Sequence, residues 1–320
     1  MRFDSMKRRE FVALLGGAVA TGAIAWPVAA RAQQAGFDPR TTPARKDLAA
    51  SHLAGKVDAQ RFVEGRPYEI GASHAPVRGA PSHGASLFTE ALKGERITIY
   101  DISEDGWAWG QLAADGYVGY LPASALRAPG PAATHKVTAL RTFVFPGPSI
   151  KLPPTEALSF GCRLAVARTE GAFAITESGG HVPALHLAGV DTTETDYVAV
   201  AERFLGAPYL WGGKTSLGLD CSALVQLALN ACGLPCPRDT DLQEQALGNA
   251  LAHPHELKRL RRGDLVFWKG HVSIVRDEAT VVHANASRHM AVAIEATAEV
   301  IPRIRKISGE VTSVRRLTPS

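Results

Sequence analysis

The hydrophobic and polar positions of this chain follow two different periods, which divide it into a β-rich part and a later part that begins with helices. Between Arg66 and Arg127, the runs RITIYDI, WAWGQL and YVGYL alternate with a period of two, and acidic-glycine turns at 104–106 and 115–116 separate them. Short alternating runs joined by such turns predict consecutive hairpins of a small β-barrel. The segment LPASAL predicts a single helical turn after Pro122.

A second, weaker copy of this pattern follows. GERITIYDISEDGW corresponds to GCRLAVARTEGAF, and DGYVGYLPASAL corresponds to SGGHVPALHL. The matching glycines are Gly94, Gly106 and Gly116 in the first copy and Gly161, Gly171 and Gly180 in the second, at offsets of 67, 65 and 64 residues. Two copies at this spacing predict a tandem of small β-barrels, over residues 66–128 and 134–190, rather than a solenoid.

After Asp191 the apolar residues recur at helical spacing. TETDYVAVAERFLG predicts a helix that ends at Gly206, and CSALVQLALNACG predicts an apolar helix with Gly233 at its end. The segments LRRGDLVFWKGHVSIV and TVVHANA then predict strands. Helices followed by an antiparallel sheet are typical of an α+β domain, which we expect over residues 194–318.

The segment before the first barrel has two parts. Residues 1–32 combine a basic start, an apolar run over 11–26 and Ala30-Arg31-Ala32, which is the layout of a cleavable export signal. Arg8-Arg9, followed by Phe11 and two leucines, resembles a twin-arginine signal. We therefore expect a periplasmic or otherwise exported protein, or a cytoplasmic one if translation starts after this segment.

An uncleaved membrane anchor is the alternative for residues 1–32, but the run is short for a bilayer and weakened by glycines. No later stretch is long and apolar enough to span a membrane, so we expect no stable span after cleavage. Residues 33–65 are polar and alanine-rich, and predict an extended lead-in with a short helix near residues 47–62.

Composition narrows the classes of function. The 320 residues are 46% hydrophobic, enough for a sizeable core and more than one domain. Five basic and two acidic residues in 1–32 carry +3 of the formal net charge of +4, so the remainder is nearly neutral. A nucleic-acid-binding protein normally keeps a basic face, and no such run is present.

Cys221 lies where the glycine-rich loop PYLWGGKTSLGLD becomes an apolar helix. Core packing, a disulfide, a metal ligand and a nucleophile are the alternatives. The unpaired N–H groups of a helix start, together with a histidine, lower the pKa of a thiol and favour the nucleophilic thiolate. The four cysteines, Cys162, Cys221, Cys232 and Cys236, lack CxxC spacing for zinc, and the last two could form a disulfide or remain small buried thiols.

His271 and His283 lie on the predicted strands HVSIV and VVHANA. If a three-residue turn over 276–278 joins the strands, residue 275 pairs with 279 and His271 lies opposite His283, on the same face of the sheet. One imidazole could then face Cys221 while the other orients it, as a nucleophile, a base and an orienting group require.

Five blocks in this order, PYLWGG, LDCSALVQ, RRGDLVFW, GHVSIV and VVHANA, resemble the motifs of the NlpC/P60 cysteine peptidases over about residues 194–316. The preceding barrels resemble the paired bacterial SH3-like domains of the γ-D-glutamyl-L-diamino-acid endopeptidases. The resemblance implies an α+β, papain-like catalytic domain preceded by two small SH3-like β-barrels. The pair His253 and His255 has no third ligand at metal spacing, and no phosphate loop is present, so we expect no metal and no other cofactor.

The resemblance also implies residue roles. Cys221 would be the nucleophile, His271 the base and His283 the group that orients it. Tyr209 would position the substrate or stabilise the oxyanion, which the N–H of Cys221 could also do. The remaining expected substrate-binding residues are Asp239 for the free amine of L-Ala, Ser222 and Thr240 for the D-Glu carboxylate, the flanking Asp220 and Arg238, and Tyr117 or Tyr120 of the first barrel. Arg238 and Asp239 could instead form a surface ion pair.

The expected substrates are murein peptides of the form L-Ala-γ-D-Glu-diamino acid, cut at the γ-D-glutamyl bond. Two other functions stay open: a thiol amidase or acyltransferase that acts on another amide or lipid ester, and a non-catalytic module that binds the cell wall. The complete Cys221, His271 and His283 set argues against the last.

Overall fold

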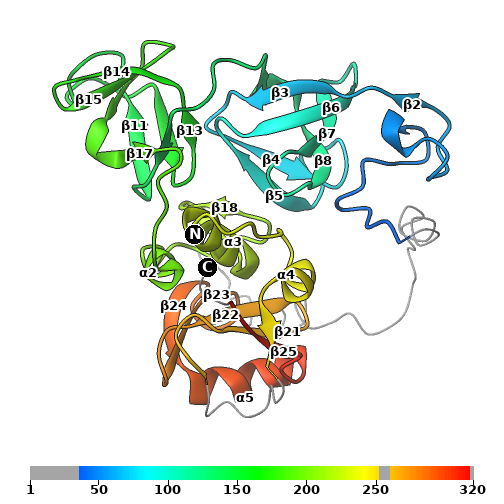
Figure 1. The fold of residues 1–320 in the computed structure, drawn as a ribbon, viewed down its shortest axis with the longest axis vertical. Coiled ribbons are helices and arrows are strands. Elements are labelled where there is room, and N and C mark those ends of the chain that lie inside the picture. Colours follow the sequence, from blue (N-terminus) through cyan, green and yellow to red (C-terminus); the bar gives the residue numbers. More distant parts are fainter. Residues whose placement is uncertain (1–35, 252–259, 318–320) are drawn as a thin grey trace, which may run out of the picture.

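The computed structural model describes residues 36–251 and 260–317. Two β-domains lie side by side, and a C-terminal α+β domain lies below them in Figure 1. The signal-like residues 1–32 and the pair His253 and His255 lie outside the described residues. No helix in the described part of the chain is long and apolar enough to cross a membrane.

The first β-domain is one sheet of seven strands in the order β5-β4-β8-β7-β6-β3-β9. Its elements are β3 (Arg66–Ile70), β4 (His74–Arg78), β5 (Leu87–Leu92), β6 (Arg96–Ile102), β7 (Trp107–Leu112), β8 (Val118–Pro122), the 3-10 turn η3 (Ala123–Ala125) and β9 (Leu126–Arg127). Ile97 and Ile99 on β6 alternate inward, as the period of two predicted, and pack with Leu112 and Leu121 in the core of this domain. The single helical turn predicted after Pro122 is η3.

The short helix predicted near residues 47–62 is wrong. The segment forms β1 (Ala49–Ala50), a 3-10 turn η2 (Ser51–Leu53) and β2 (Phe62–Val63). Leu48, Ala49 and Ala50 are all buried, so these buried side chains are consecutive and not at helical spacing. Leu48 packs with Trp109 and Val118 of the first β-domain. Gly55 then takes a left-handed conformation (φ 76°), which a continuing helix does not allow.

The second β-domain ends like the first one, with a strand, a 3-10 turn and a final short strand. Its elements are β10 (His135–Val137), β11 (Arg141–Val144), β12 (Glu156–Ser159), β13 (Arg163–Leu164), β14 (Val166–Glu170), β15 (Phe173–Thr176), β16 (His181–Pro183), η4 (Ala184–His186) and β17 (Leu187–Gly189). The turn glycine that matches Gly116 is Gly179, with φ 83°, and not Gly180 as the repeat suggested. The predicted tandem of β-barrels thus takes the form of two related β-domains.

The C-terminal domain is an antiparallel sheet of six strands in the order β20-β25-β21-β22-β23-β24, with helices on both faces. Its helices are α2 (Tyr197–Glu202), α3 (Cys221–Ala231), α4 (Thr240–Ala246) and α5 (Thr297–Ser308). Its strands are β18 (Lys214–Thr215), β19 (Gly218–Leu219), β20 (Asn249–Ala250), β21 (Leu265–Trp268), β22 (His271–Val275), β23 (Thr280–Asn285), β24 (Ala291–Ala296) and β25 (Ser313–Arg316). Leu265 and Phe267 pack with α3, whereas Val266 and Trp268 pack with α5. Figure 1 shows α5 on the side of the sheet away from the β-domains.

Both β-domains are docked on the C-terminal domain. The apolar core around α2 and α3 continues into the second β-domain, where Phe160 meets Phe204 with ring centroids 5.5 Å apart. The first β-domain is joined by polar contacts: Lys214 N–H donates to Glu90 at 2.7 Å, and its ammonium pairs with Glu95 at 3.0 Å. These contacts fix the first β-domain beside the loop that leads to Cys221.

Candidate active site

Cys221 is the first residue of α3 because Asp220 caps that helix. Asp220 has an extended backbone (φ −97°, ψ 179°), and its Oδ1 accepts the N–H of Ala223 at 2.8 Å. The side chain of Cys221 is buried, and the backbone N–H of Val272, next to His271, lies near its sulfur. The thiol therefore lies between the start of α3 and strand β22.

The protonation of Cys221 differs from the expectation. Burial and, next, the Asp220 carboxylate raise the pKa of the Cys221 thiol to about 12, although the Val272 N–H acts in the opposite direction. Loss of water around the sulfur outweighs the effect of the helix start. Cys221 is thus a neutral thiol at neutral pH, and it needs a base to become a nucleophile.

His271 and His283 are joined directly: Nε2 of His271 lies 2.9 Å from Nδ1 of His283. The predicted strand register is wrong by two residues, because β22 and β23 pair Val275 with Val281 and not with residue 279. A longer turn joins the strands, with Arg276 N–H donating to Thr280 O. A shift of two residues keeps both imidazoles on one face of the sheet, so the pair still forms.

Glu295 on β24 extends this pair and was not among the residues predicted from the sequence. Nε2 of His283 lies 3.0 Å from Glu295 Oε1. Glu295 also accepts hydrogen bonds from Asn285 at 2.5 Å and from Arg303 at 2.7 Å. Burial opposes its ionisation, but the hydrogen bonds from His283, Arg303 and Asn285 hold the pKa of Glu295 well below its usual range.

An ionised Glu295 decides which ring nitrogens carry protons. A carboxylate only accepts, so His283 donates Nε2–H to Glu295 and presents a lone pair at Nδ1. His271 then donates Nε2–H to His283, which leaves Nδ1 of His271 as a base. Burial and, next, the neighbouring His283 ring lower the pKa of His271 to about 3, so this base is unprotonated at neutral pH.

Tyr209 lies close to Cys221. Burial and, next, the nearness of Cys221 raise the pKa of Tyr209, which keeps the phenol neutral. Its N–H donates to Met290 O at 2.7 Å and holds the loop in place. Its hydroxyl makes no hydrogen bond with any described residue, so it can donate one to a substrate oxygen.

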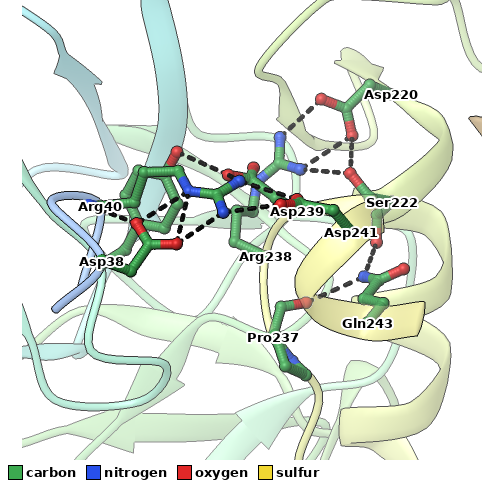
Figure 2. Close-up of polar contacts among 10 residues, drawn as sticks. Asp38, Arg40, Asp220, Ser222, Pro237, Arg238, Asp239, Asp241 and Gln243 are labelled. Atoms are coloured by element: carbon green, nitrogen blue, oxygen red, sulfur yellow. Dashed lines mark hydrogen bonds and ion pairs between the residues drawn. The ribbon is translucent and has the colours of Figure 1, made fainter. Parts of the chain in front are cut away.

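Arg238 forms a buried ion pair with Asp220, and not a surface pair with Asp239. Its side chain is 1% exposed, and its guanidinium contacts both carboxylate oxygens of Asp220 at 2.9 and 2.7 Å. Its other contacts are Thr89 Oγ1, Ser222 Oγ and Gly213 O. All five N–H groups of Arg238 are therefore used within the protein, and Arg238 positions Asp220 and Ser222, as Figure 2 shows.

Asp239 and Tyr117 meet across the boundary between the first β-domain and α4. The Tyr117 hydroxyl donates to Asp239 Oδ2 at 3.1 Å, whereas Tyr120 accepts from Arg45 at 3.3 Å. Tyr117 is thus the tyrosine of this pair that reaches Asp239. Thr240, the next residue, has a hydroxyl with no partner among the described residues.

Arg40 is the second residue near the site that was not predicted. Its Nη1 donates to Asp239 Oδ2 at 2.9 Å, although 199 residues separate the two in sequence. An arginine in a polar lead-in carries no local signal of such a contact. The acidic residue in the apolar strand AVAIEA, in contrast, was a visible signal for Glu295.

This geometry agrees with the comparisons with known proteins. Residues 206–307 match the sequence model of the NlpC/P60 family, and residues 77–126 match that of the bacterial dipeptidyl-peptidase Sh3 domain. The chain therefore carries an NlpC/P60 domain behind a bacterial SH3 domain, and the resemblance of the five motifs is confirmed.

The proteins similar to this chain include two curated relatives and one solved structure. Dipeptidyl-peptidase 6 of Lysinibacillus sphaericus is 34% identical over 28% of this chain and 31% of its own. Gamma-D-glutamyl-L-lysine dipeptidyl-peptidase of Bacillus cereus (strain ATCC 10987 / NRS 248) is 30% identical over 33% and 31%. The chain thus spans about a third of the length of these relatives. The structure of an NlpC/P60 family protein from Bacillus cereus ATCC 10987 has a TM-score of 0.65 at 20% identity, over 79% of this chain and all of that one, which shows the shared fold.

Proposed function

We propose that this protein is a cysteine peptidase that hydrolyses the γ-D-glutamyl–diamino acid bond of murein stem peptides. The observation that carries the proposal is the hydrogen-bonded pair of His271 and His283 beside the buried thiol at the start of α3. A nucleophile, a base and an orienting group are the parts that covalent acyl transfer requires.

The reaction begins when Nδ1 of His271 takes the proton from Cys221 as the sulfur attacks the γ-carbonyl carbon of D-Glu. The oxyanion that forms meets the N–H of Cys221 at the start of α3 and the hydroxyl of Tyr209. The carbon–nitrogen bond then breaks, and His271 returns its proton to the leaving amine of the diamino acid. A thioester between Cys221 and the D-Glu carbonyl remains.

Water completes the cycle. His271 takes a proton from a water molecule, whose oxygen attacks the thioester carbon, and the carbon–sulfur bond breaks with return of the proton to Cys221. The products are the diamino acid part and L-Ala-D-Glu. His283 and Glu295 keep Nδ1 of His271 directed to this exchange throughout, because they determine its tautomer.

Substrate selection rests on the residues around Asp239. The free amine of an N-terminal L-Ala would pair with the Asp239 carboxylate, which Tyr117 also contacts. The hydroxyl of Thr240 would bind the D-Glu carboxylate. The Ser222 hydroxyl, expected in the same role, is already used within the protein, because it donates to Asp220 Oδ1 at 3.1 Å and accepts from Arg238 at 2.8 Å. The names of two relatives, which are dipeptidyl-peptidases, support a substrate with two residues before the cut bond.

An exported location would bring the enzyme to this substrate, and the signal-like residues 1–32 favour it. N-terminal sequencing of the protein recovered from cell fractions tests this location. A start at Gln33 in the exported fraction agrees with it, and a cytoplasmic protein that starts elsewhere contradicts it.

Incubation of the purified protein with L-Ala-γ-D-Glu-diaminopimelate tests the reaction. We expect release of L-Ala-D-Glu and of free diaminopimelate, in equal amounts and without an added acceptor. Cys221→Ala should abolish this release, whereas Cys232→Ala and Cys236→Ala should retain it. Transfer to an added nucleophile with no hydrolysis would point to an acyltransferase instead.

A further inference from the structure

Arg40 stands at a junction of three parts of the chain. Its carbonyl accepts the N–H of Val118 in the first β-domain at 2.8 Å. Its guanidinium reaches Asp239 and Asp241, at the start of α4, and Asp38 in its own segment. Figure 2 shows these three carboxylates around Arg40, and we name the four residues the Arg40 cluster.

The guanidinium is held without the help of Asp239. Nη1 and Nη2 each contact Asp241 at 2.7 Å, and Nε and Nη2 contact Asp38 at 3.0 and 2.6 Å. Two forked contacts of this kind fix the plane of an arginine side chain. Arg40 is therefore a fixed part of the site and does not depend on Asp239 for its position.

The charges of the Arg40 cluster do not cancel. Three carboxylates face one guanidinium, and the neighbouring Arg238 is already paired with Asp220. Two negative charges thus remain when all three carboxylates are ionised. A site with this net negative charge attracts one more cation, whereas a neutral amide has no charge for it to attract.

Asp239 keeps one oxygen available for that cation. Tyr117 and Arg40 both donate to Oδ2, and no group in the described part of the chain donates to Oδ1. Asp239 occupies the N-cap position of α4, but its side chain makes no capping hydrogen bond there. The carboxylate is thus turned away from its own helix, with Oδ2 clamped and Oδ1 free.

We propose that Arg40 is a specificity-determining residue, which positions Asp239 so that Oδ1 accepts the free amino group of the substrate. This inference rests on the proposed function and adds to it a residue from outside both matched domains. Burial already raises the pKa of Asp239, and Arg238 and Arg40 are the cations that oppose this effect. Removal of Arg40 leaves only Arg238 of these two and leaves three carboxylates close together, so their repulsion favours a protonated and displaced Asp239. A protonated Asp239 no longer distinguishes an ammonium from an amide.

The test compares kcat/KM for L-Ala-γ-D-Glu-diaminopimelate and for its N-acetylated form, in the wild type and in Arg40→Gln and Arg40→Lys. Glutamine keeps hydrogen-bonding atoms but has no charge. Lysine keeps the charge but lacks the paired N–H groups with which the guanidinium makes its forked contacts. We expect Arg40→Gln to reduce the preference for the free peptide about tenfold or more, through a higher KM and with little change in kcat. Arg40→Lys should retain more of the preference than Arg40→Gln.

Arg45→Ala is the matched control, because Arg45 belongs to the same lead-in segment. It pairs with Asp47 and lies 4.8 Å from the Trp109 ring, so its loss loosens the segment away from Asp239. We expect the control to keep the wild-type preference. A preference that falls equally in Arg45→Ala would show that Arg40 acts only by holding the segment, and would overturn the inference.

Failure of the inference and failure of the proposed function give different results. If the wild type prefers the free peptide and Arg40→Gln keeps that preference, Arg40 does not determine specificity, whereas the proposed function stands. If the wild type cuts both peptides equally, Asp239 does not recognise the free amino group, and that part of the proposed function is wrong.

Discussion

Glu295 accepts the Nε2 proton of His283 at 3.0 Å, from the adjacent strand β24. This contact turns a pair of histidines into a directed chain that ends at Nδ1 of His271, the proposed base. The same residue is tied to α5 through Arg303, so the proton positions of the site depend on a helix on the opposite side of the sheet from α3.

Glu295→Gln should reduce kcat roughly ten- to hundredfold, the range typical of the carboxylates that orient metal-binding histidines through the same kind of hydrogen bond. The charge of Glu295 raises the pKa of His271, so its removal lowers that pKa further. His271 must be neutral to act, and the acid limb of kcat/KM, already well below pH 6.5, should therefore move to lower pH. Glu299→Gln, at an exposed pair with Arg288, is the control and should change neither quantity. A wild-type pH profile in Glu295→Gln would contradict the role of Glu295.

The two histidines should respond differently to substitution. His271→Ala removes the proton acceptor and should lower turnover by about 10²–10⁴-fold. His283→Ala should be milder, and His283→Gln milder still, because an amide can also hydrogen-bond the ring of His271. Single-turnover rates on the tripeptide measure this order. If His283→Gln were as inactive as His271→Ala, the two roles would have to be exchanged or abandoned.

Alkylation of Cys221 should depend on pH over an unusually wide range. Because burial raises the pKa of Cys221 to about 12, the thiolate fraction is small at pH 7 and grows steadily toward pH 10. The rate of iodoacetamide labelling should rise over this whole interval, after subtraction of labelling in Cys221→Ala. A plateau below pH 8 would mean that the helix start, and not burial, sets the pKa of this thiol.

The buried pair of Arg238 and Asp220 should matter for stability. Arg238→Ala leaves the carboxylate of Asp220 buried without its cation, which typically costs about 3–5 kcal/mol. Urea unfolding measures this loss. The control, Arg203→Ala, breaks a half-exposed pair with Glu194 and should cost much less. Equal losses in the two variants would contradict a structural role for Arg238.

Local pattern was enough to predict the helix α3 and the strands β6, β7, β21, β22 and β23. In β6 the buried side chains alternate, as the period of two predicts. The helix α3 and the strands β7, β21, β22 and β23 are buried along nearly their whole length, so their apolar runs marked them, and glycines mark the ends, as Gly233 does with φ 76°. The order of the motifs likewise predicted a site made of Cys221, His271 and His283, and the structure shows the hydrogen bond between the two histidines.

Such local patterns do not predict contacts between segments that are distant in the sequence. The pairing of Arg40 with Asp239 depends on how the first β-domain docks, and the lead-in 47–62 was misread because alanine content favours a helix in isolation. The register of β22 and β23 was misjudged because it depends on the length of the turn. The pKa of Cys221 was misjudged because burial is set by tertiary packing.

The most direct measurement is the ratio of kcat/KM for L-Ala-γ-D-Glu-diaminopimelate to that for its N-acetylated form in the wild-type protein. Acetylation removes the cation that Asp239 would bind, and the loss of one partner from a buried charge pair typically costs about 2–5 kcal/mol. We therefore expect a preference for the free peptide of at least about thirtyfold, with no cleavage of either peptide by Cys221→Ala. Equal values for the two peptides would contradict recognition of a free amino terminus.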